Sequence, residues 1–481
     1  MAERVAQTRE GLRTVALFLV IFLLSFIASW VPSFWYDEAA TLRLARLPAD
    51  EFLAFVSTRD AVHAVYAAFM HAWIGVFGES ELSVRLPSVL AASASAIGVY
   101  ALARRWGGRG AGLGAAVIFA FLPRTLIQGI EARSFSIATL LIVLAAVLIV
   151  RAAEREQLLW WIGYLIVILA AIWIYAFAIL VTPAFAILAD RADRSRRARM
   201  GRAAVLLAIP ALLATPLFLM LLQQRGQVAW LSEQPLNPYT ALVEPFFGNA
   251  VWLLVAVIAL LGWAIWRRTL TWSRHTVALL VWLALPLAVL VTVSIVTQPV
   301  FAARYLSMSS PALAIFCGLA MRRWRTRAVL AFAIAWMLAV LPFAVGTRVP
   351  TAKPGGVNFR AITAEIASNA MPGDGFILQN TGTGALRPRT AIAAYPAGFA
   401  NLRDLAYVDS FVTTGTFWDT TKTPTPADLA RLERVWLASR PGSDLPQLLT
   451  KAGFREQSTS TITGVVVSRW QRETTRERHG S

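Results

Sequence analysis

Two adjacent acidic residues follow the first long apolar run of the chain. The run covers residues 15–31, and residues 34–38 read FWYDE, so Asp37 and Glu38 lie beside three aromatic residues. Carboxylates at the end of a bilayer-length segment are costly to desolvate, which indicates a use such as proton transfer. The alternative is structural, with Asp37 and Glu38 capping the next helix and the aromatic residues lying in the membrane interface. We expect Asp37 and Glu38 to form the reaction centre.

Further polar residues lie at the ends of later apolar runs. Glu131 and Arg133 occur in the segment 128–135, Arg304 begins another apolar run with Tyr305, and His63 opens the stretch after Asp60. Each has a simpler interpretation: Glu131 and Arg133 as a local ion pair, Arg304 as an arginine reaching the membrane surface, and His63 as an interfacial histidine. Carboxylates, an arginine and a histidine in one pocket would favour catalysis over these separate interpretations.

The composition defines the class of protein. Of 481 residues, 57% are hydrophobic and 15% are charged, and apolar runs of bilayer-spanning length recur along the chain. This pattern is typical of a polytopic membrane protein. The net charge of +18 comes from short basic clusters between apolar runs, which favours a topology signal over nucleic-acid binding. The single cysteine, Cys317, lies in an apolar run, so neither a disulfide framework nor a thiol metal site is expected.

The arginines orient the predicted spans. The apolar stretch 61–77 must either span the membrane or lie in the outer interface. If it lies in the interface, the basic clusters, including those at 191–202 and 322–327, fall in the cytoplasm, as the positive-inside rule requires. Eleven spans, a cytoplasmic N-terminus and a C-terminal part outside the cell membrane are then expected. After 15–31 the spans are 83–104, 110–126, 135–151, 158–174, 176–189, 203–222, 251–266, 275–296, 303–320 and 327–346.

The chain changes character after residue 346. A Pro- and Gly-rich linker covers 347–358, and shorter amphipathic and β-prone segments follow. We therefore expect a transmembrane domain over 1–346, with an outer loop at 32–82, and a small extracytoplasmic α/β domain over 347–481. Helices are predicted at 359–368 and 426–433, and strands at 376–379, 391–395, 405–408, 435–439 and 461–470.

Several short motifs follow one another within residues 14–320. They are Trp35 to Ala39, Asp60 to His63 with Tyr66, Phe77 to Glu81, Arg85 to Ser88, Gln128 to Arg133, and Arg304-Tyr305. Together they resemble the motifs of the GT-C membrane glycosyltransferases, most of all the branch of protein O-mannosyltransferases, lipid A aminoarabinose transferases and actinobacterial mannosyltransferases. The resemblance implies a GT-C fold, a first outer loop with two membrane-surface helices, and inverting transfer of a sugar from a polyprenyl-phosphate donor.

Such a reaction assigns different roles to the acidic residues. Asp37 is the candidate general base that takes the proton of the acceptor hydroxyl. Neighbouring side chains in an extended loop point in different directions, so Glu38 is expected to hold the loop or a sugar hydroxyl. Glu131 is expected to assist from a facing turn. No cofactor is required by the motifs, and a divalent metal stays open.

The basic and aromatic residues are expected to bind the substrates. A fixed arginine can bind the leaving lipid phosphate through two hydrogen bonds, and Arg304 is the first candidate, with Arg133 second and Tyr305 beside it. His63, Tyr66 and Tyr36 are expected to contact the sugar or the acceptor. The partners would be a polyprenyl-phosphate sugar carrying mannose or an arabinose-like residue, a cell-envelope acceptor, and the lipid bilayer.

Two other classes of protein would also need many spans. A transporter or flippase of a lipid-linked sugar usually carries essential charges near the bilayer midplane on broken helices, often in repeated halves. Here no repeat is visible and the charges lie at predicted helix ends. A non-catalytic scaffold would leave the acidic loop at Asp37 without a role. The sequence therefore favours a multi-pass glycosyltransferase of the cell membrane.

Overall fold

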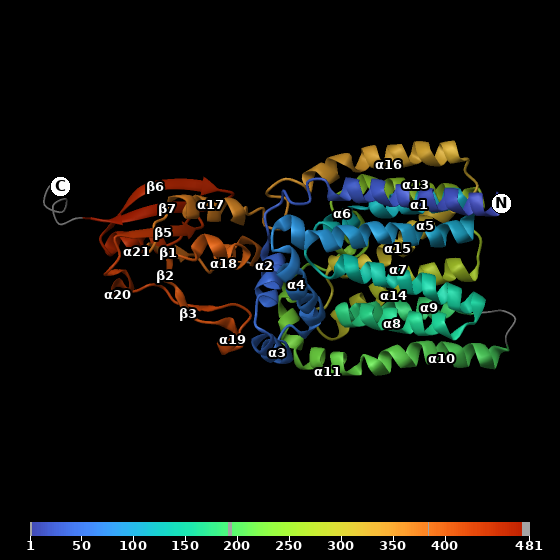
Figure 1. Ribbon diagram of the computed structural model, residues 1–481, viewed down its shortest axis with the longest axis horizontal. Coiled ribbons are helices and arrows are strands. Elements are labelled where there is room, and N and C mark those ends of the chain that lie inside the picture. The colour runs from blue at the N-terminus through green and yellow to red at the C-terminus, as the bar shows by residue number, and fades with distance from the viewer. Residues whose placement is uncertain (1, 191–194, 383, 474–481) are drawn as a thin grey trace. The chain divides into compact units, whose positions relative to one another are not determined.

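The computed structural model describes residues 2–190, 195–382 and 384–473, and this part of the chain is mainly helical (Figure 1). It packs as two compact units, each built from segments that lie far apart in the sequence. The helical unit comprises Met1–Ser29, Asp60–Tyr66 and Leu82–Gly346, and the mixed unit comprises Trp30–Arg59, Ala67–Glu81 and Thr347–Ser481.

Long apolar segments form the helical unit. A helix satisfies its backbone hydrogen bonds within the segment, which makes it the favoured form for a chain in hydrocarbon. The longer helices are α1 (Ala2–Phe26), α5 (Glu81–Ala120), α7 (Phe135–Arg155), α8 (Leu158–Ile174), α10 (Arg196–Leu213), α13 (Val251–Trp266), α14 (Arg274–Val296), α15 (Ser310–Ala320) and α16 (Thr326–Gly346). The shorter ones are η1 (Ala61–His63), α6 (Pro123–Gly129), η2 (Ala176–Val181), α9 (Thr182–Leu188), α11 (Thr215–Gln223), η3 (Arg225–Glu233), η4 (Tyr239–Val243), α12 (Glu244–Phe247) and η5 (Ala303–Ser309).

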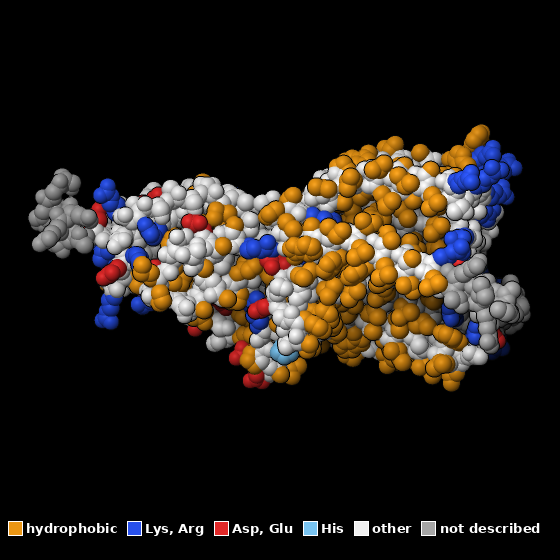
Figure 2. Space-filling view, turned by 45° about the horizontal axis from the view of Figure 1, so that its top comes forward, with side chains coloured by type: hydrophobic (Ala, Val, Ile, Leu, Met, Phe, Trp, Pro, Cys, Tyr) orange, Lys and Arg blue, Asp and Glu red, His pale blue; other side chains and the backbone are white. Residues whose placement is uncertain are grey.

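Several of these helices could cross a membrane. Among the described residues, four are long and apolar enough, namely α5, α7, α14 and α16, and the number rises to six if each of two bent helix pairs counts as one span. Large hydrophobic residues are exposed on α16, and Figure 2 shows hydrophobic side chains covering much of the helical unit, with Lys and Arg gathered at one end. This surface is that of a multi-pass membrane protein. The number of eleven spans remains a prediction.

Two breaks divide long apolar stretches. The 40-residue α5 leaves helical geometry at Gly108, where φ is 81° and ψ is −177°. This conformation is open only to glycine, so Gly108 separates two helices in place of one long rod. The stretch 158–189 is broken at Tyr175, which is extended (φ −155°, ψ 93°) between α8 and η2.

The first part of the mixed unit is helical. Residues 49–58 form α3 (Ala49–Thr58), and α4 (Ala64–Phe77) follows η1. The prediction of an extended loop at Asp37 and Glu38 was wrong, because helix α2 (Tyr36–Ala45) begins at Tyr36. Both carboxylates lie in its first turn, where acidic residues interact favourably with the helix dipole.

A five-stranded sheet organises the rest of the mixed unit. Its order is β2-β1-β5-β7-β6, with β1 parallel to β2 and β5 and with β7 antiparallel to its neighbours. All four residues of β1 are buried, as expected of a strand covered on both faces. The strands are β1 (Gly375–Leu378), β2 (Arg403–Asp404), β5 (Arg434–Ser439), β6 (Phe454–Ile462) and β7 (Val465–Arg472), with β3 (Tyr407–Asp409) and β4 (Thr420–Thr421) forming a separate pair.

Short helices flank this sheet (Figure 1). The prediction of a strand at 391–395 was wrong, because these residues lie mostly in helix α18. The single strand expected at 461–470 instead spans the turn of a hairpin, in which β6 and β7 meet at Gly464 (φ 79°). An alternation of Ala with larger residues in a short segment does not distinguish helix from strand. The helices are α17 (Phe359–Asn369), α18 (Thr390–Ala394), α19 (Phe411–Thr414), α20 (Pro426–Leu429) and α21 (Leu445–Lys451), with turns η6 (Gly384–Leu386) and η7 (Pro396–Phe399).

Candidate active site

The end of α6 and the turn that follows it carry three buried polar side chains of the helical unit. Gln128, Glu131 and Arg133 are 5%, 5% and 7% exposed. Two serines fix the backbone of this turn: Ser88 Oγ donates to the Glu131 carbonyl oxygen at 2.6 Å, and Ser136 Oγ donates to the Gln128 carbonyl oxygen at 2.9 Å. Buried polar groups cost free energy unless they are paired, so a turn that holds them is rigidly specified.

His63 meets this turn through Arg133. The guanidinium Nη2 of Arg133 lies 2.7 Å from His63 Nε2, and Asp60 Oδ1 lies 4.0 Å from the same nitrogen. Burial, and then the positive charges of Arg133 and Arg304, hold the pKa of His63 well below its ordinary value. The imidazole is therefore neutral and Nε2 accepts the hydrogen bond from Arg133.

Arg304 lies close to the same residues. The side-chain amide of Gln128 donates to the Arg304 carbonyl oxygen at 3.3 Å, and the Arg304 guanidinium carbon is 5.3 Å from the Trp230 ring centre. Tyr175, at the break after α8, donates its hydroxyl hydrogen to the Tyr305 carbonyl oxygen at 2.6 Å. Turn η5 is thus held from two sides.

Arg124 is a further arginine that the sequence analysis missed. It was counted within the predicted span 110–126, yet it lies on α6, 8% exposed, and donates to the carbonyl oxygens of Pro245 (3.0 Å) and Glu244 (2.9 Å). Burial lowers the pKa of Arg124, while the charge of Glu131 raises it and that of Arg304 lowers it, so these groups lie within electrostatic reach. A lone arginine inside an apolar run was the signal available in the sequence.

The candidate residues at 36–38 belong to the mixed unit. Glu38 is fully buried, whereas Tyr36 and Asp37 are half-buried. The indole Nε1 of Trp418 donates to the Tyr36 hydroxyl oxygen, and their ring centres are 4.9 Å apart. Burial raises the pKa of Tyr36, so its hydroxyl stays protonated. Helix α2 therefore presents Asp37 next to an aromatic side chain that is fixed by the C-terminal segment of the same unit.

A cavity of about 270 Å³ adjoins α2 in the mixed unit. Arg43, 9% exposed, has its guanidinium carbon 3.9 Å from the Phe411 ring centre and 4.3 Å from that of Trp418. Stacking of this kind fixes an arginine while leaving its charge in place. The charged and aromatic residues that line the cavity are Arg43, Arg46, Arg387, Arg389, Phe411, Trp418 and Asp419.

Tyr66, the remaining candidate, is 1% exposed in the helical unit. Within the helical unit, His63, Arg133, Arg304 and Glu131 are linked by hydrogen bonds or charge, and within the mixed unit Tyr36, Asp37 and Glu38 begin one helix. Across residues 2–190, 195–382 and 384–473, no group of three or more His, Cys, Asp or Glu side chains could hold a metal ion.

Part of the helical unit matches a known protein family. Residues 63–229 match the dolichyl-phosphate-mannose-protein mannosyltransferase family. No curated protein matches the sequence. The match covers the His63 turn, α6 and the segment with Glu131 and Arg133.

The fold is similar to that of two solved glycosyltransferases. ArnT from Cupriavidus metallidurans bound to undecaprenyl phosphate shares 14% sequence identity at a TM-score of 0.56, covering 96% of this chain and 98% of that chain. The archaeal oligosaccharyltransferase AglB from Archaeoglobus fulgidus, in complex with an inhibitory peptide and a dolichol-phosphate, shares 11% identity at a TM-score of 0.50, covering 95% and 74%. The GT-C resemblance is confirmed, and the family and fold matches together indicate a glycosyltransferase.

Proposed function

We propose that this protein is an inverting glycosyltransferase that moves a mannose or arabinose-like sugar from a polyprenyl-phosphate donor to a cell-envelope acceptor outside the membrane. The observation that carries the proposal is the group of three arginines, Arg124, Arg133 and Arg304, beside neutral His63 in an apolar helical unit. Ionisable side chains are rare in the apolar part of a membrane protein and often mark a substrate site. Guanidinium groups bind phosphate through charge-assisted hydrogen bonds, and the undecaprenyl phosphate of the similar ArnT structure supports a lipid phosphate as the ligand.

The reaction exchanges one C–O bond for another. The acceptor hydroxyl oxygen attacks the anomeric carbon of the sugar and forms the new bond, while the bond from that carbon to the phosphate oxygen breaks. The acceptor proton passes to Asp37, and the bonding electron pair leaves with the polyprenyl phosphate. Attack from the face opposite the phosphate inverts the anomeric configuration.

We assign stabilisation of the leaving group to Arg304 and Arg133. Negative charge grows on the phosphate as the bond breaks, and a preorganised guanidinium contributes a few kcal/mol, roughly 10²–10³-fold in rate, in a site shielded from water. Neutral His63 accepts a hydrogen bond from Arg133 and so orients that guanidinium. Tyr305 is assigned to the donor phosphate beside Arg304, and Tyr66 to the sugar.

We assign the acceptor side to α2. Asp37 is the general base, Tyr36 positions the acceptor, and Glu38, which is fully buried, supports the start of the helix. Glu131 is assigned to the donor side, where its charge supports Arg124. The cavity beside Arg43 is suited to hold the part of the acceptor beyond the reacting hydroxyl, because it combines cationic and aromatic side chains.

Transfer of label tests the proposal directly. The purified full-length protein in detergent is incubated with radiolabelled polyprenyl-phosphate mannose, or with the corresponding arabinose donor, and with cell-envelope extract. Label in the acceptor fraction, together with release of polyprenyl phosphate, is expected. A flippase would instead move the labelled lipid across proteoliposomes with its sugar attached, and that result would replace the proposed function.

A further inference from the structure

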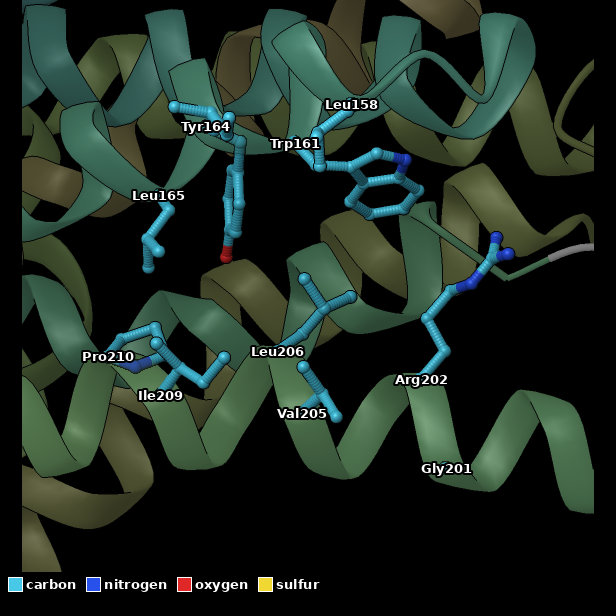
Figure 3. Close-up of a pocket in the computed structure, with 11 residues that line it drawn as sticks. Leu158, Trp161, Tyr164, Leu165, Gly201, Arg202, Val205, Leu206, Ile209 and Pro210 are labelled. Carbon is cyan, nitrogen blue, oxygen red and sulfur yellow. The ribbon is translucent and has the colours of Figure 1, made fainter.

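An apolar groove lies between α8 and α10 in the helical unit, remote in sequence from every residue assigned above. It holds about 440 Å³, and Figure 3 shows α8 on one side and α10 on the other. Leu158, Trp161 and Leu165 line it from α8, and Leu206 and Ile209 from α10. Hydrocarbon side chains of this kind favour an apolar chain as the occupant.

Two polar groups in the groove lack hydrogen-bond partners among the described residues. Tyr164, 1% exposed, points its hydroxyl into the groove from α8, and its oxygen has no partner (Figure 3). Arg202 lies toward one end of the groove, and its buried Nη1 has no partner either. Leaving a buried polar group without a hydrogen bond is unfavourable, so each group indicates a missing ligand atom.

The guanidinium group of Arg202 is only partly engaged by its neighbours. Arg202 Nη2 is 3.6 Å from Glu156 Oε1, and its guanidinium carbon is 5.1 Å from the Trp161 ring centre. These contacts leave Nη1 for an anion. Trp161 and Tyr164 are three residues apart, about 4.5 Å along the helix axis, so the cation and the hydroxyl are offset along the groove by about one helical turn.

We propose that this groove binds one anionic glycerophospholipid, with its phosphate at Arg202, an ester carbonyl at the Tyr164 hydroxyl and an acyl chain along the apolar lining. A polyprenyl phosphate could offer its phosphate to Arg202, but its chain is pure hydrocarbon and has no acceptor for the Tyr164 hydroxyl. A phospholipid carries an anion, ester acceptors and an apolar chain in that order, which matches the groove from Arg202 to Pro210. The basic segment that opens α10, with Arg196, Arg197 and Arg199, adds attraction for an anionic headgroup.

Native mass spectrometry of the full-length protein in detergent tests the proposal. Phosphatidylglycerol and phosphatidylcholine with the same acyl chains are added separately. Both present a phosphate, but the choline cation of phosphatidylcholine offsets that charge beside Arg202 and the arginines that open α10, so about tenfold stronger retention of phosphatidylglycerol is expected. Arg202→Gln should remove this preference. Tyr164→Phe should weaken the binding of both lipids alike.

A filled groove provides the matched control. Val205, which lines the groove, is replaced by Trp, and Leu212, exposed on the same helix outside the groove, is replaced by Trp in a second variant. Only Val205→Trp should lose the phospholipid. Equal retention of the two headgroups by the unmodified protein would overturn the proposal without any variant. So would displacement of phosphatidylglycerol by equimolar undecaprenyl phosphate, which would make the groove part of the donor site.

Discussion

The substitution Asp37→Asn distinguishes a catalytic role of this carboxylate from a structural role. Asn keeps the size and one acceptor oxygen but is not a base, so Asp37→Asn should lower sugar transfer roughly 10²–10⁴-fold while donor binding and thermal unfolding stay close to normal. Asp50→Asn is the matched control, because Asp50 occupies the first turn of α3 and is exposed. Near-normal turnover of Asp37→Asn would make the carboxylate a helix-capping group and move the search for the base to Glu38 or Glu131.

Arg304 tests how the donor phosphate is bound. Lysine keeps the positive charge but loses the planar fork, so Arg304→Lys should raise the KM for the donor and lower kcat, and Arg304→Ala should do both more strongly. Steady-state kinetics with a labelled donor measure the two effects. Arg225→Ala, an exposed arginine that opens η3, should leave both constants unchanged. Equal kinetics for Arg304→Lys and the unmodified protein would show that charge alone suffices.

His63 predicts a dependence of stability on pH. Its folded pKa lies well below the ordinary value of about 6.5, so the unfolded chain takes up the proton first as the pH falls. Stability is full above pH 6.5 and is lost below it, by up to about 1.4 kcal/mol per pH unit for one proton. The unfolding temperature should therefore fall less steeply between pH 8 and pH 5 for His63→Gln than for the unmodified protein. Parallel curves would show that folding leaves the pKa of His63 unchanged.

At the residue scale, sequence patterns select candidate residues but do not show which residues they contact. The adjacent carboxylates and the arginine before Tyr305 stand out because charge is rare in apolar segments. The hydrogen bond between Arg133 and His63 joins residues 70 positions apart, which no local pattern shows. Arg124 was missed because an apolar run of span length outweighed one charge in it.

At the element scale, Gly108 sets the break within α5. Its φ of 81° with ψ of −177° is strained for any residue with a Cβ, although a Cβ there would meet no atom within 4 Å. Gly108→Ala should therefore destabilise the protein by roughly 1–3 kcal/mol through the backbone alone. Gly262→Ala, in the middle of α13 and equally open, should be neutral or stabilising by up to about 1 kcal/mol. Thermal unfolding of the two variants in the same detergent measures both effects. An equal change in unfolding temperature would show that the backbone conformation at Gly108 does not require glycine.

Elements with a clear period were predicted well. Helix α17 and strands β1 and β5 lie within one or two residues of the expected ranges, because amphipathic and buried apolar segments carry a strong local signal. Helix α2 was not expected, since its residues have no amphipathic period and most are buried on all sides. Its position depends on packing with residues after 347, for example Tyr36 with Trp418, and distant contacts of that kind are invisible in a local window.

At the scale of the whole molecule, sidedness is the main prediction. In a Cys317→Ser background, single cysteines at Ser57 and Thr381 should react with an impermeant thiol reagent in intact cells, whereas one at Ser195 should react only after lysis. All three side chains are exposed, so access of the reagent decides the result. Labelling of Ser195→Cys in intact cells would reverse the orientation and with it the proposed outer active site.

The composition of the mixed unit has a consequence for biosynthesis. Trp30–Arg59 and Ala67–Glu81 form this unit with Thr347–Ser481, so more than half the chain is made between the early segments and their partner. At roughly 5–20 residues per second, the early segments wait on the order of tens of seconds with Tyr36 and Arg43 lacking their aromatic neighbours. Helix α2, which carries Asp37, gains these aromatic contacts only when the last segment has been synthesised. A chain truncated before Thr347 would lack the aromatic neighbours of α2, and we expect no sugar to be transferred before synthesis ends.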